Sequence, residues 1–261
     1  MVQFGKIAVI GAGNVAYTLC KVLKNKGIMP FCVLVRNEIS AEKMRHDLNV
    51  NVVSDYEKIM ESDFLIIAVN DDAISEVAMH LLDYKGLVVH TSGTKTSEVL
   101  NRIERYGVFY PLQTMSKERE LSFDDVPLLI YANSPEDLIR LRGFAKQLSS
   151  IVKYCDDEHR KAIHLTAVFV SNFTNVMLGI GDKLLKDTGL SLSVMRPLVK
   201  EMIEKSFDIS PENALTGPAR RGDLATIQSH REMLSDNPKE IEIYNILTNY
   251  ILEKYHKNEK L

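Results

Sequence analysis

Lys6-Ile-Ala-Val-Ile-Gly11-Ala-Gly13-Asn-Val-Ala16 is the stretch of this sequence that decides its fold. The apolar run predicts a β-strand, and the glycines end it in a turn that opens a helix. In this G-x-G-x-x-A pattern Gly11 permits a tight turn, Gly13 lets a diphosphate approach the backbone, and Ala16 lets the helix pack closely on the strand. Free N–H groups and the helix dipole favour negative charge there. The pattern predicts a dinucleotide site formed by Gly11, Ala12, Gly13, Asn14 and Val15.

The residues after the second apolar run, Phe31–Val35, indicate which dinucleotide is bound. Folds that prefer NAD place an acidic residue there, which accepts a hydrogen bond from the ribose 2′-hydroxyl. This sequence has Arg36 and Asn37 instead. A guanidinium binds a 2′-phosphate through paired hydrogen bonds, whereas a carboxylate would repel it. We therefore expect Arg36 and Asn37 to bind NADP. The alternative is that Arg36 is only a solvated residue at the end of a strand.

Strand-like runs and helical patterns alternate in the first half of the chain, which predicts a doubly wound, mostly parallel α/β sheet over residues 1–152. The predicted strands are Lys6–Ile10, Phe31–Val35, Phe64–Val69, Leu87–His90, Val108–Tyr110, Leu128–Tyr131 and Ile151–Tyr154. The predicted helices are Asn14–Lys26, Ala41–Leu48, Asp72–Leu82 and Pro135–Leu148. After Tyr154 only helical patterns remain, so we expect residues 153–261 to form a separate all-α domain.

The loops that follow the strands are expected to form the site, because ligands bind outside the carboxyl ends of the strands in open α/β sheets. Val69 ends one predicted strand and Asn70 follows it, and Thr91 and Ser92 follow the next predicted strand. We expect these four residues to flank the nicotinamide half of the cofactor.

The same edge of the sheet offers groups for the substrate. Ser92 is expected to contact it, together with Gly93 beside it and Tyr110 at the end of a further strand. Asp71 and Asp72 lie in the first of these loops, and the simplest interpretation of both is that they begin the next helix, where acidic side chains are favoured.

The segment Ala162–Gly181 contains no Asp, Glu, Lys or Arg and is about as long as a bilayer span. Its many hydrogen-bonding side chains would be costly in lipid, so we interpret it as an internal helix. His164 and Asn172 fall near one face, with Ser171 beside it. Hydride delivery to a carbonyl or imine needs a proton, which His164 could supply while Ser171 and Asn172 orient the substrate. The alternative is a buried structural histidine.

The loop Thr216–Asp223 concentrates positive charge in a turn that contains two glycines and a proline. The adjacent guanidiniums of Arg220 and Arg221 could hold a substrate carboxylate or the cofactor phosphates. We therefore expect Gly217, Arg220 and Arg221 to bind substrate, with a surface position for the arginines as the alternative. Asp223 is expected to cap the following helix.

Composition excludes several classes of protein. The chain has 261 residues and a net charge of −3, so no basic field favours nucleic acid or an anionic membrane as partner. Three cysteines without C-x-x-C spacing indicate neither a disulfide framework nor a zinc site, and the seven histidines show no metal-ligand spacing. With no signal-peptide pattern at the N-terminus, a reducing cytoplasm is the expected setting, and no metal is expected.

Six motifs together resemble one group of oxidoreductases. They are Gly11-Ala-Gly13-Asn-Val-Ala16, Val69-Asn-Asp-Asp72, His90-Thr-Ser-Gly93, Tyr110-Pro-Leu-Gln-Thr114, Ser171-Asn-Phe173 and Leu215-Thr-Gly-Pro-Ala-Arg-Arg-Gly-Asp223. Through them nearly the whole chain is similar to NADP oxidoreductases that have a Rossmann domain followed by a helical domain of unknown function. That family is related to pyrroline-5-carboxylate reductase, to 6-phosphogluconate and β-hydroxyacid dehydrogenases, and to deazaflavin-dependent NADP reductases.

The resemblance implies an NADP-binding Rossmann domain, a helical domain like that of 6-phosphogluconate dehydrogenase that completes the active-site cleft, and a homodimer through that domain. The sequence departs from the relatives at two points. Tyr110 stands where a histidine is expected, and the Lys-x-x-x-Asn pair of β-hydroxyacid dehydrogenases has no counterpart on the long helix. The expected activity is NADPH-dependent reduction of a small, anionic carbonyl or imine. The alternative is a non-catalytic sensor or scaffold that binds NADP.

Overall fold

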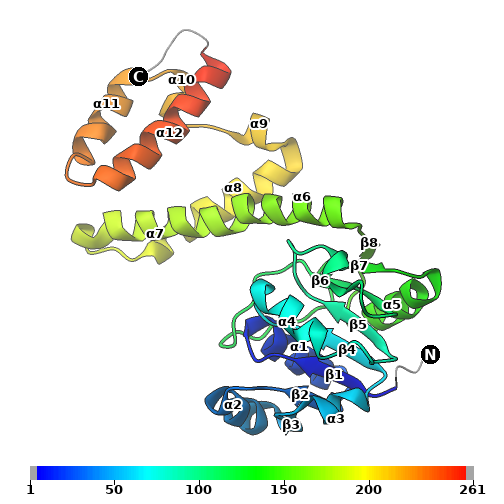
Figure 1. The fold of residues 1–261 in the computed structure, drawn as a ribbon. Coiled ribbons are helices and arrows are strands. Elements are labelled where there is room, and N and C mark those ends of the chain that lie inside the picture. Colours follow the sequence, from blue (N-terminus) through cyan, green and yellow to red (C-terminus); the bar gives the residue numbers. More distant parts are fainter. Residues whose placement is uncertain (1–4, 257–261) are drawn as a thin grey trace. The chain divides into compact units, whose positions relative to one another are not determined.

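A computed structural model describes residues 5–256 of the protein (Figure 1). Contacts divide the chain into two compact units, Met1–Asn172 and Phe173–Leu261. The division falls later than the boundary expected near residue 153, because the first helix after the sheet, α6 (Asp157–Ala167), is hydrogen-bonded to a loop of the sheet domain. Each unit is described by itself.

The first unit is built on an eight-stranded sheet in the order β3-β2-β1-β4-β5-β6-β7-β8. The strands are β1 (Ile7–Ile10), β2 (Cys32–Leu34), β3 (Val52–Val53), β4 (Phe64–Ile67), β5 (Leu87–His90), β6 (Tyr106–Pro111), β7 (Leu128–Ala132) and β8 (Val152–Tyr154). Neighbouring strands are parallel except β6 and β7. This confirms the predicted doubly wound, mostly parallel sheet. The prediction missed β3, because a strand of two residues has no alternation that a sequence pattern can show.

Both faces of the sheet are covered. Along β1, Ile7 and Val9 enter one apolar core while Ala8 and Ile10 enter the other, as the two-residue period of a strand requires. The first core also receives side chains of α1 (Asn14–Asn25), α2 (Glu38–Leu48) and α5 (Pro135–Leu148). The second receives side chains of α3 (Tyr56–Met60), α4 (Ile74–Met79) and the 3₁₀ turn Ser97–Leu100. A pocket lies at the carboxyl ends of β1, β2 and β4.

Side-chain caps define the starts of α5 and α2. Ser134 accepts a hydrogen bond from the Asp137 N–H at the start of α5, as its sequence predicts. Asn37 accepts from the Ser40 N–H, so α2 begins at Glu38, earlier than the predicted Ala41. The helix predicted from Asp72 is instead a 3₁₀ turn, Asp71–Ala73, followed by the short α4.

The second unit contains only helices in its described residues. A π-helical segment, Val168–Phe173, joins α6 to α7 (Thr174–Leu185), and 3₁₀ turns follow at Lys186–Thr188 and Leu192–Met195. The remaining helices are α8 (Arg196–Ile209), α9 (Pro211–Ala214), α10 (Pro218–Arg221), α11 (Leu224–Met233) and α12 (Pro238–Tyr255). Ala219, Ile227 and Leu252 form a small core for the last three helices. Asp223 caps α11 as predicted, because it accepts from the Thr226 N–H at 3.1 Å.

The long uncharged helix is exposed within a single chain. The helical stretch Asp157–Thr188 is long and apolar enough, by length and composition, to cross a membrane, and none of its apolar window is buried. Leu165 and Val170 are 58% and 67% exposed, and α8 likewise buries no residue. The prediction of a buried internal helix is therefore not met in the described residues, where none of the apolar window of this stretch is buried. A homodimer through this unit stays a prediction.

Candidate active site

The turn between β1 and α1 leaves space for a ligand beside its second glycine. Gly11 has φ +124°, and a Cβ there would stand 2.2 Å from the carbonyl oxygen of Ala68, so only glycine fits this crossing of two strands. Gly13 has no heavy atom within 4 Å of the place of a Cβ. It is also the N-cap of α1 and provides no side-chain cap for the first N–H groups. The open space and the uncapped N–H groups fit an anion.

A pocket of about 500 Å³ surrounds this turn. The predicted cofactor residues that line it are Gly11, Ala12, Gly13, Arg36, Asn37, Val69 and Asn70. Asn14 and Val15 form the first turn of α1 beside it. Thr91 and Ser92 do not line the pocket; Thr91 Oγ1 donates to the carbonyl of Ile67 at 3.3 Å, while Ser92 belongs to the polar cluster described below.

Two basic side chains line the pocket. Arg36 Nη1 donates to Glu76 Oε1 at 2.9 Å, and both side chains are more than half exposed. An exposed pair of this kind contributes about 0–1 kcal/mol, so an incoming phosphate can replace Glu76 at little cost. Lys117 is the second cation, and the prediction missed it. Its segment follows β6, and the only sequence signal was the position of that loop at the carboxyl edge of the sheet.

A second polar cluster follows β4 and β5. Ser92 Oγ donates to Asp71 Oδ2 at 2.8 Å, and Thr94 Oγ1 donates to the same oxygen. Ser92 Oγ also accepts from the N–H groups of Thr94 and Lys95, which folds the loop tightly around it. Asp71 begins the 3₁₀ turn Asp71–Ala73, as its simple interpretation predicts, and its carboxylate in addition binds these hydroxyls across the sheet edge. The carboxylate is part of the candidate site.

His164 is brought to this cluster by α6. Its Nδ1 lies 3.0 Å from the phenol oxygen of Tyr110, and the two share a hydrogen bond. Gly93 packs against both rings: a Cβ at Gly93 would stand 2.4 Å from His164 Nδ1 and 3.0 Å from Tyr110 Cζ. The absence of a side chain at residue 93 is therefore what lets His164 approach Tyr110.

The pair has the groups that a proton transfer needs. Burial raises the pKa of Tyr110, with the Asp71 carboxylate adding to the rise and the Arg160 guanidinium opposing it. Tyr110 is therefore a neutral phenol at neutral pH, and its hydroxyl shares with His164 Nδ1 the hydrogen bond along which a proton can move. Tyr110 and His164, predicted for separate roles, form one unit here.

Five other predicted residues belong to the π-helical segment or to the second unit. Ser171 and Asn172 lie in the π-helical segment, where wider turns rotate side chains relative to an α-helix, and neither side chain has a hydrogen-bond partner in the described part of the chain. Gly217, Arg220 and Arg221 belong to the second unit, where Arg220 stacks on the Tyr255 ring at 4.0 Å. Roles for these five residues in catalysis or substrate binding stay predictions.

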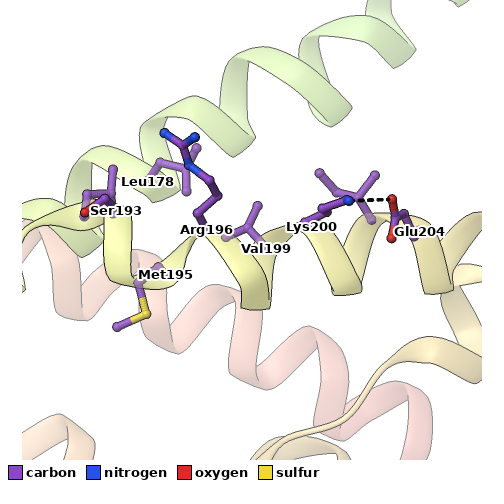
Figure 2. A pocket seen from close by; sticks show the side chains of 9 residues that line it. Leu178, Ser193, Met195, Arg196, Val199, Lys200 and Glu204 are labelled. Atoms are coloured by element: carbon purple, nitrogen blue, oxygen red, sulfur yellow. Dashed lines mark ion pairs between the residues drawn. The ribbon is translucent and has the colours of Figure 1, made fainter.

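The second unit has a pocket of its own between α7 and α8. It has a volume of about 570 Å³ and is mostly apolar (Figure 2). Its charged groups are Arg196 and the Lys200–Glu204 pair, which is 3.7 Å apart. Within residues 5–256 no group of three or more His, Cys, Asp or Glu side chains could hold a metal ion, so neither pocket resembles a metal centre.

Two family models match the sequence. Residues 6–92 match the model described as "NADP oxidoreductase coenzyme F420-dependent". Residues 126–251 match a domain of unknown function, DUF2520. No curated protein sequence matches the chain.

Solved structures match over nearly the whole chain. A structure from Bacteroides fragilis, described as the "putative NADP oxidoreductase BF3122", is 37% identical, covers 95% of this chain and 98% of its own, and has a TM-score of 0.88. Protein TM1727 from Thermotoga maritima is 20% identical, with coverage of 96% and 98% and a TM-score of 0.67. A pyrroline-5-carboxylate reductase from Coxiella burnetii is 16% identical, with coverage of 99% and 100% and a TM-score of 0.60. The last two show a common fold.

Proposed function

Because this chain belongs to the NADP oxidoreductase family that joins an NADP oxidoreductase domain to DUF2520, we propose that it reduces a small, anionic carbonyl or imine with NADPH. The observation that carries the proposal is the Tyr110–His164 pair packed on Gly93. It places a proton donor at the carboxyl edge of the sheet, the edge that also carries the glycine turn.

The residues around the turn fit the cofactor. The open position at Gly13 and the uncapped start of α1 suit a diphosphate, and Arg36 and Lys117 offer cations for phosphate oxygens. When bound, NADPH supplies the hydride. The residues of the pocket would hold its phosphates. Asn70 lines this pocket, and Ser92 is hydrogen-bonded to Asp71, the residue next to Asn70.

The Tyr110–His164 pair then supplies the proton. A carbonyl or imine that accepts a hydride develops negative charge on oxygen or a basic lone pair on nitrogen. The Tyr110 phenol donates its proton to that atom, and His164 returns a proton through Nδ1 to the phenol oxygen. Solvent then supplies a proton to His164, so each substrate takes up one hydride from the cofactor and one proton from solvent. Tyr110 donates its proton directly to the substrate, and His164 returns a proton to Tyr110.

The observation that supports an anionic substrate is the turn formed by α10 and the glycines on either side of it. Gly217 and Gly222 both have positive φ, which gives the compact turn that the sequence predicts around Arg220 and Arg221. Arg221 is largely exposed and lies 3.9 Å from Asp223, so its guanidinium has donors left for a carboxylate.

A panel of small keto acids and cyclic imines tests the proposed function. We expect at least one compound to oxidise NADPH in one-to-one proportion to its own reduction, as measured by cofactor absorbance and by mass spectrometry of the product. Tight NADPH binding without turnover of any compound in a broad metabolite panel would instead identify a sensor or scaffold.

Arg36 is expected to decide the choice between NADPH and NADH. Wild type should bind NADPH at least about tenfold more tightly, since a paired contact to a phosphate is worth about 1.5–3 kcal/mol. Arg36→Glu should reverse the preference by repelling the 2′-phosphate. Glu76→Gln should tighten NADPH binding about two- to threefold and leave NADH unchanged, because it frees Arg36. Fluorescence titration of the three proteins with each cofactor measures all six dissociation constants.

Arg45→Glu is the matched control for this titration. Arg45 makes an exposed ion pair with Glu38 on α2 and does not line the pocket. Its charge reversal should leave the ratio of the two affinities unchanged. Equal affinities of the wild-type protein for NADPH and NADH would contradict the role of Arg36.

A further inference from the structure

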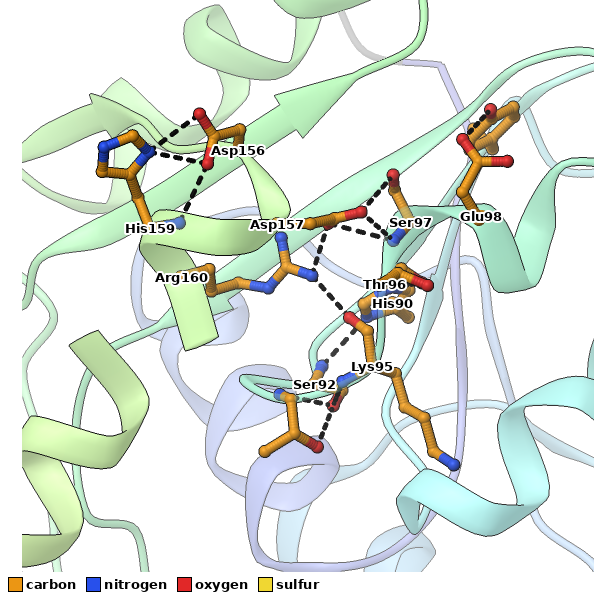
Figure 3. Close-up of polar contacts among 12 residues, drawn as sticks. His90, Ser92, Lys95, Thr96, Ser97, Glu98, Asp156, Asp157, His159 and Arg160 are labelled. Atoms are coloured by element: carbon orange, nitrogen blue, oxygen red, sulfur yellow. Dashed lines mark hydrogen bonds and ion pairs between the residues drawn. The ribbon is translucent and has the colours of Figure 1, made fainter. Parts of the chain in front are cut away.

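One stripe of α6 is paired with the loop that contains Ser92 and Gly93. Asp157, Arg160 and His164 are three and four residues apart, so they lie on one face of the helix. Asp157 contacts Ser97, Arg160 contacts Lys95, and His164 packs on Gly93. As the residue number rises along α6, the residue number of the contacted loop position falls, so the helix and the loop run antiparallel. Figure 3 shows the first two of these contacts.

Asp157 holds the end of the loop. Its carboxylate accepts from the Ser97 N–H at 3.0 and 2.9 Å and from Ser97 Oγ at 3.0 Å. Burial opposes ionisation of Asp157, but hydrogen bonds from Arg160 and Ser97 outweigh it and lower the pKa of the carboxyl below its ordinary value. Asp157 is therefore charged at neutral pH and accepts three charge-assisted hydrogen bonds from Ser97.

Arg160 holds the middle of the loop. Its side chain is fully buried, and Nη2 donates both to Asp157 Oδ1 at 2.7 Å and to the carbonyl of Lys95. Nε and Nη1 have no hydrogen-bond partner among the described residues. A buried guanidinium that is only partly paired is costly, and replacing it alone would also leave the Asp157 carboxylate without its ion-pair partner. The bonds that Arg160 does make join α6 to the loop at Lys95.

His90, the last residue of β5, holds the loop as well. His90 Nδ1 accepts from the Ser92 N–H at 3.1 Å, so the neutral ring carries its proton on Nε2, which lies 3.3 Å from the carbonyl oxygen of Thr96. Burial first, and then the Arg160 charge, lower the pKa of His90 to about 4. The loop is thus held by hydrogen bonds from two elements. Neutral His90 binds it from the end of β5, and Asp157 and Arg160 bind it from α6.

We propose that Arg160 is a positioning residue that fixes α6 against the Ser92–Ser97 loop and thereby places His164 against Gly93 and Tyr110. Its importance for the reaction rests on the function proposed above. Arg160 lies one helical turn before His164, so a shift of the helix at Arg160 moves the imidazole by a similar amount. Misplacement of a reacting group by about 1 Å costs about 100-fold in rate.

Arg160→Met and Arg160→Lys test the proposal by amide hydrogen exchange and by NMR of ¹⁵N-labelled histidine, neither of which needs a substrate. In Arg160→Met, exchange at residues 92–97 should accelerate at least about tenfold while exchange in β1 and α1 changes less than about twofold. The ring signals of His164 should lose the signature of the bond to Tyr110. Arg160→Lys keeps the positive charge but not the planar set of guanidinium donors. It should therefore restore the exchange rates and the His164 signals only in part.

Activity on any compound that the panel identifies gives the second measurement. We expect kcat of Arg160→Met to fall about 100-fold with NADPH affinity within about twofold of wild type. Exchange that rises equally throughout residues 5–172, or unchanged His164 signals, would show that Arg160 only stabilises the fold. If the exchange and NMR results are as expected but no compound is ever reduced, the positioning role of Arg160 is supported and the proposed function is contradicted.

Ser97→Ala is the variant to use if Arg160→Met does not fold. It removes the hydroxyl that donates to Asp157 and leaves both charges in place. A smaller, local increase of exchange at residues 92–97 supports the proposal, and exchange identical to wild type with unchanged His164 signals overturns it.

Discussion

Gly93→Ala is expected to lower kcat for NADPH oxidation by about 100-fold, although residue 93 contributes no reacting group. The added Cβ would stand 2.4 Å from His164 Nδ1 and 3.0 Å from Tyr110 Cζ, so the imidazole must move away from the phenol. A displacement of about 1 Å at a reacting group costs about this factor. NADPH affinity should stay near the wild-type value, because Gly93 does not line the cofactor pocket.

A double-mutant cycle separates this effect from a general loss of packing. His164→Ala alone is expected to lower kcat by about 100-fold or more, the range of general acid catalysis. The Gly93→Ala/His164→Ala double variant should be no slower than His164→Ala, because both changes remove the same proton transfer. Additive losses would contradict the role of Gly93 as the space for His164.

Gly179→Ala is the control for the glycine substitution. Gly179 lies in α7 and has no heavy atom within 4 Å of the place of a Cβ. Its substitution by alanine should leave kcat unchanged. A wild-type kcat in Gly93→Ala, with the protein folded, would refute the packing argument.

Gly13→Ala is expected to weaken NADPH binding at least about tenfold, or about 1.4 kcal/mol, without loss of stability. Gly13 has an ordinary φ of −70° and open space around the place of its Cβ, so the folded protein accommodates the methyl group. The methyl then occupies the space that a diphosphate needs. Thermal unfolding and fluorescence titration of the same samples measure the two effects.

Gly11→Ala provides the contrast. Its φ of +124° and the 2.2 Å separation from the Ala68 carbonyl oxygen predict a loss of stability in the protein itself. The neighbouring glycines should therefore differ in which quantity they change: Tm for Gly11, and Kd for Gly13. An unchanged Kd in a folded Gly13→Ala variant would mean that the diphosphate does not lie at this turn.

The sheet was predictable because its information is local. The apolar runs at Ile7–Ile10, Phe64–Ile67 and Leu87–His90 are continuous and bounded by turn residues, which is the pattern of strands buried on both faces. The glycine turn was predictable for the same reason, since its G-x-G-x-x-A spacing lies within one short strand–turn–helix segment, residues 7–16. Short or weakly patterned elements such as β3 and α3 were missed, because a few residues carry no period.

The candidate site was predictable only in part. The carboxyl edge of the sheet places Ser92, Gly93 and Tyr110 in one region, and the apolar helix pointed to His164. That Tyr110 and His164 form a pair could not be predicted, because 54 residues separate them and the register of α6 on the sheet edge sets their contact. Asn37, in contrast, was predicted from the sequence as a cofactor residue. It lines the pocket, and its side chain also caps α2.

By itself the sequence determined the parallel sheet, the dinucleotide turn and the helical second half, since strand runs, glycines and helix periods act over a few neighbouring residues. Only the tertiary structure decided that Asp71 binds Ser92 and that Asp157 and Arg160 clamp the loop beside His164. The physical reason is that these contacts join residues 21 to 65 positions apart, so they exist only after the sheet and α6 have packed.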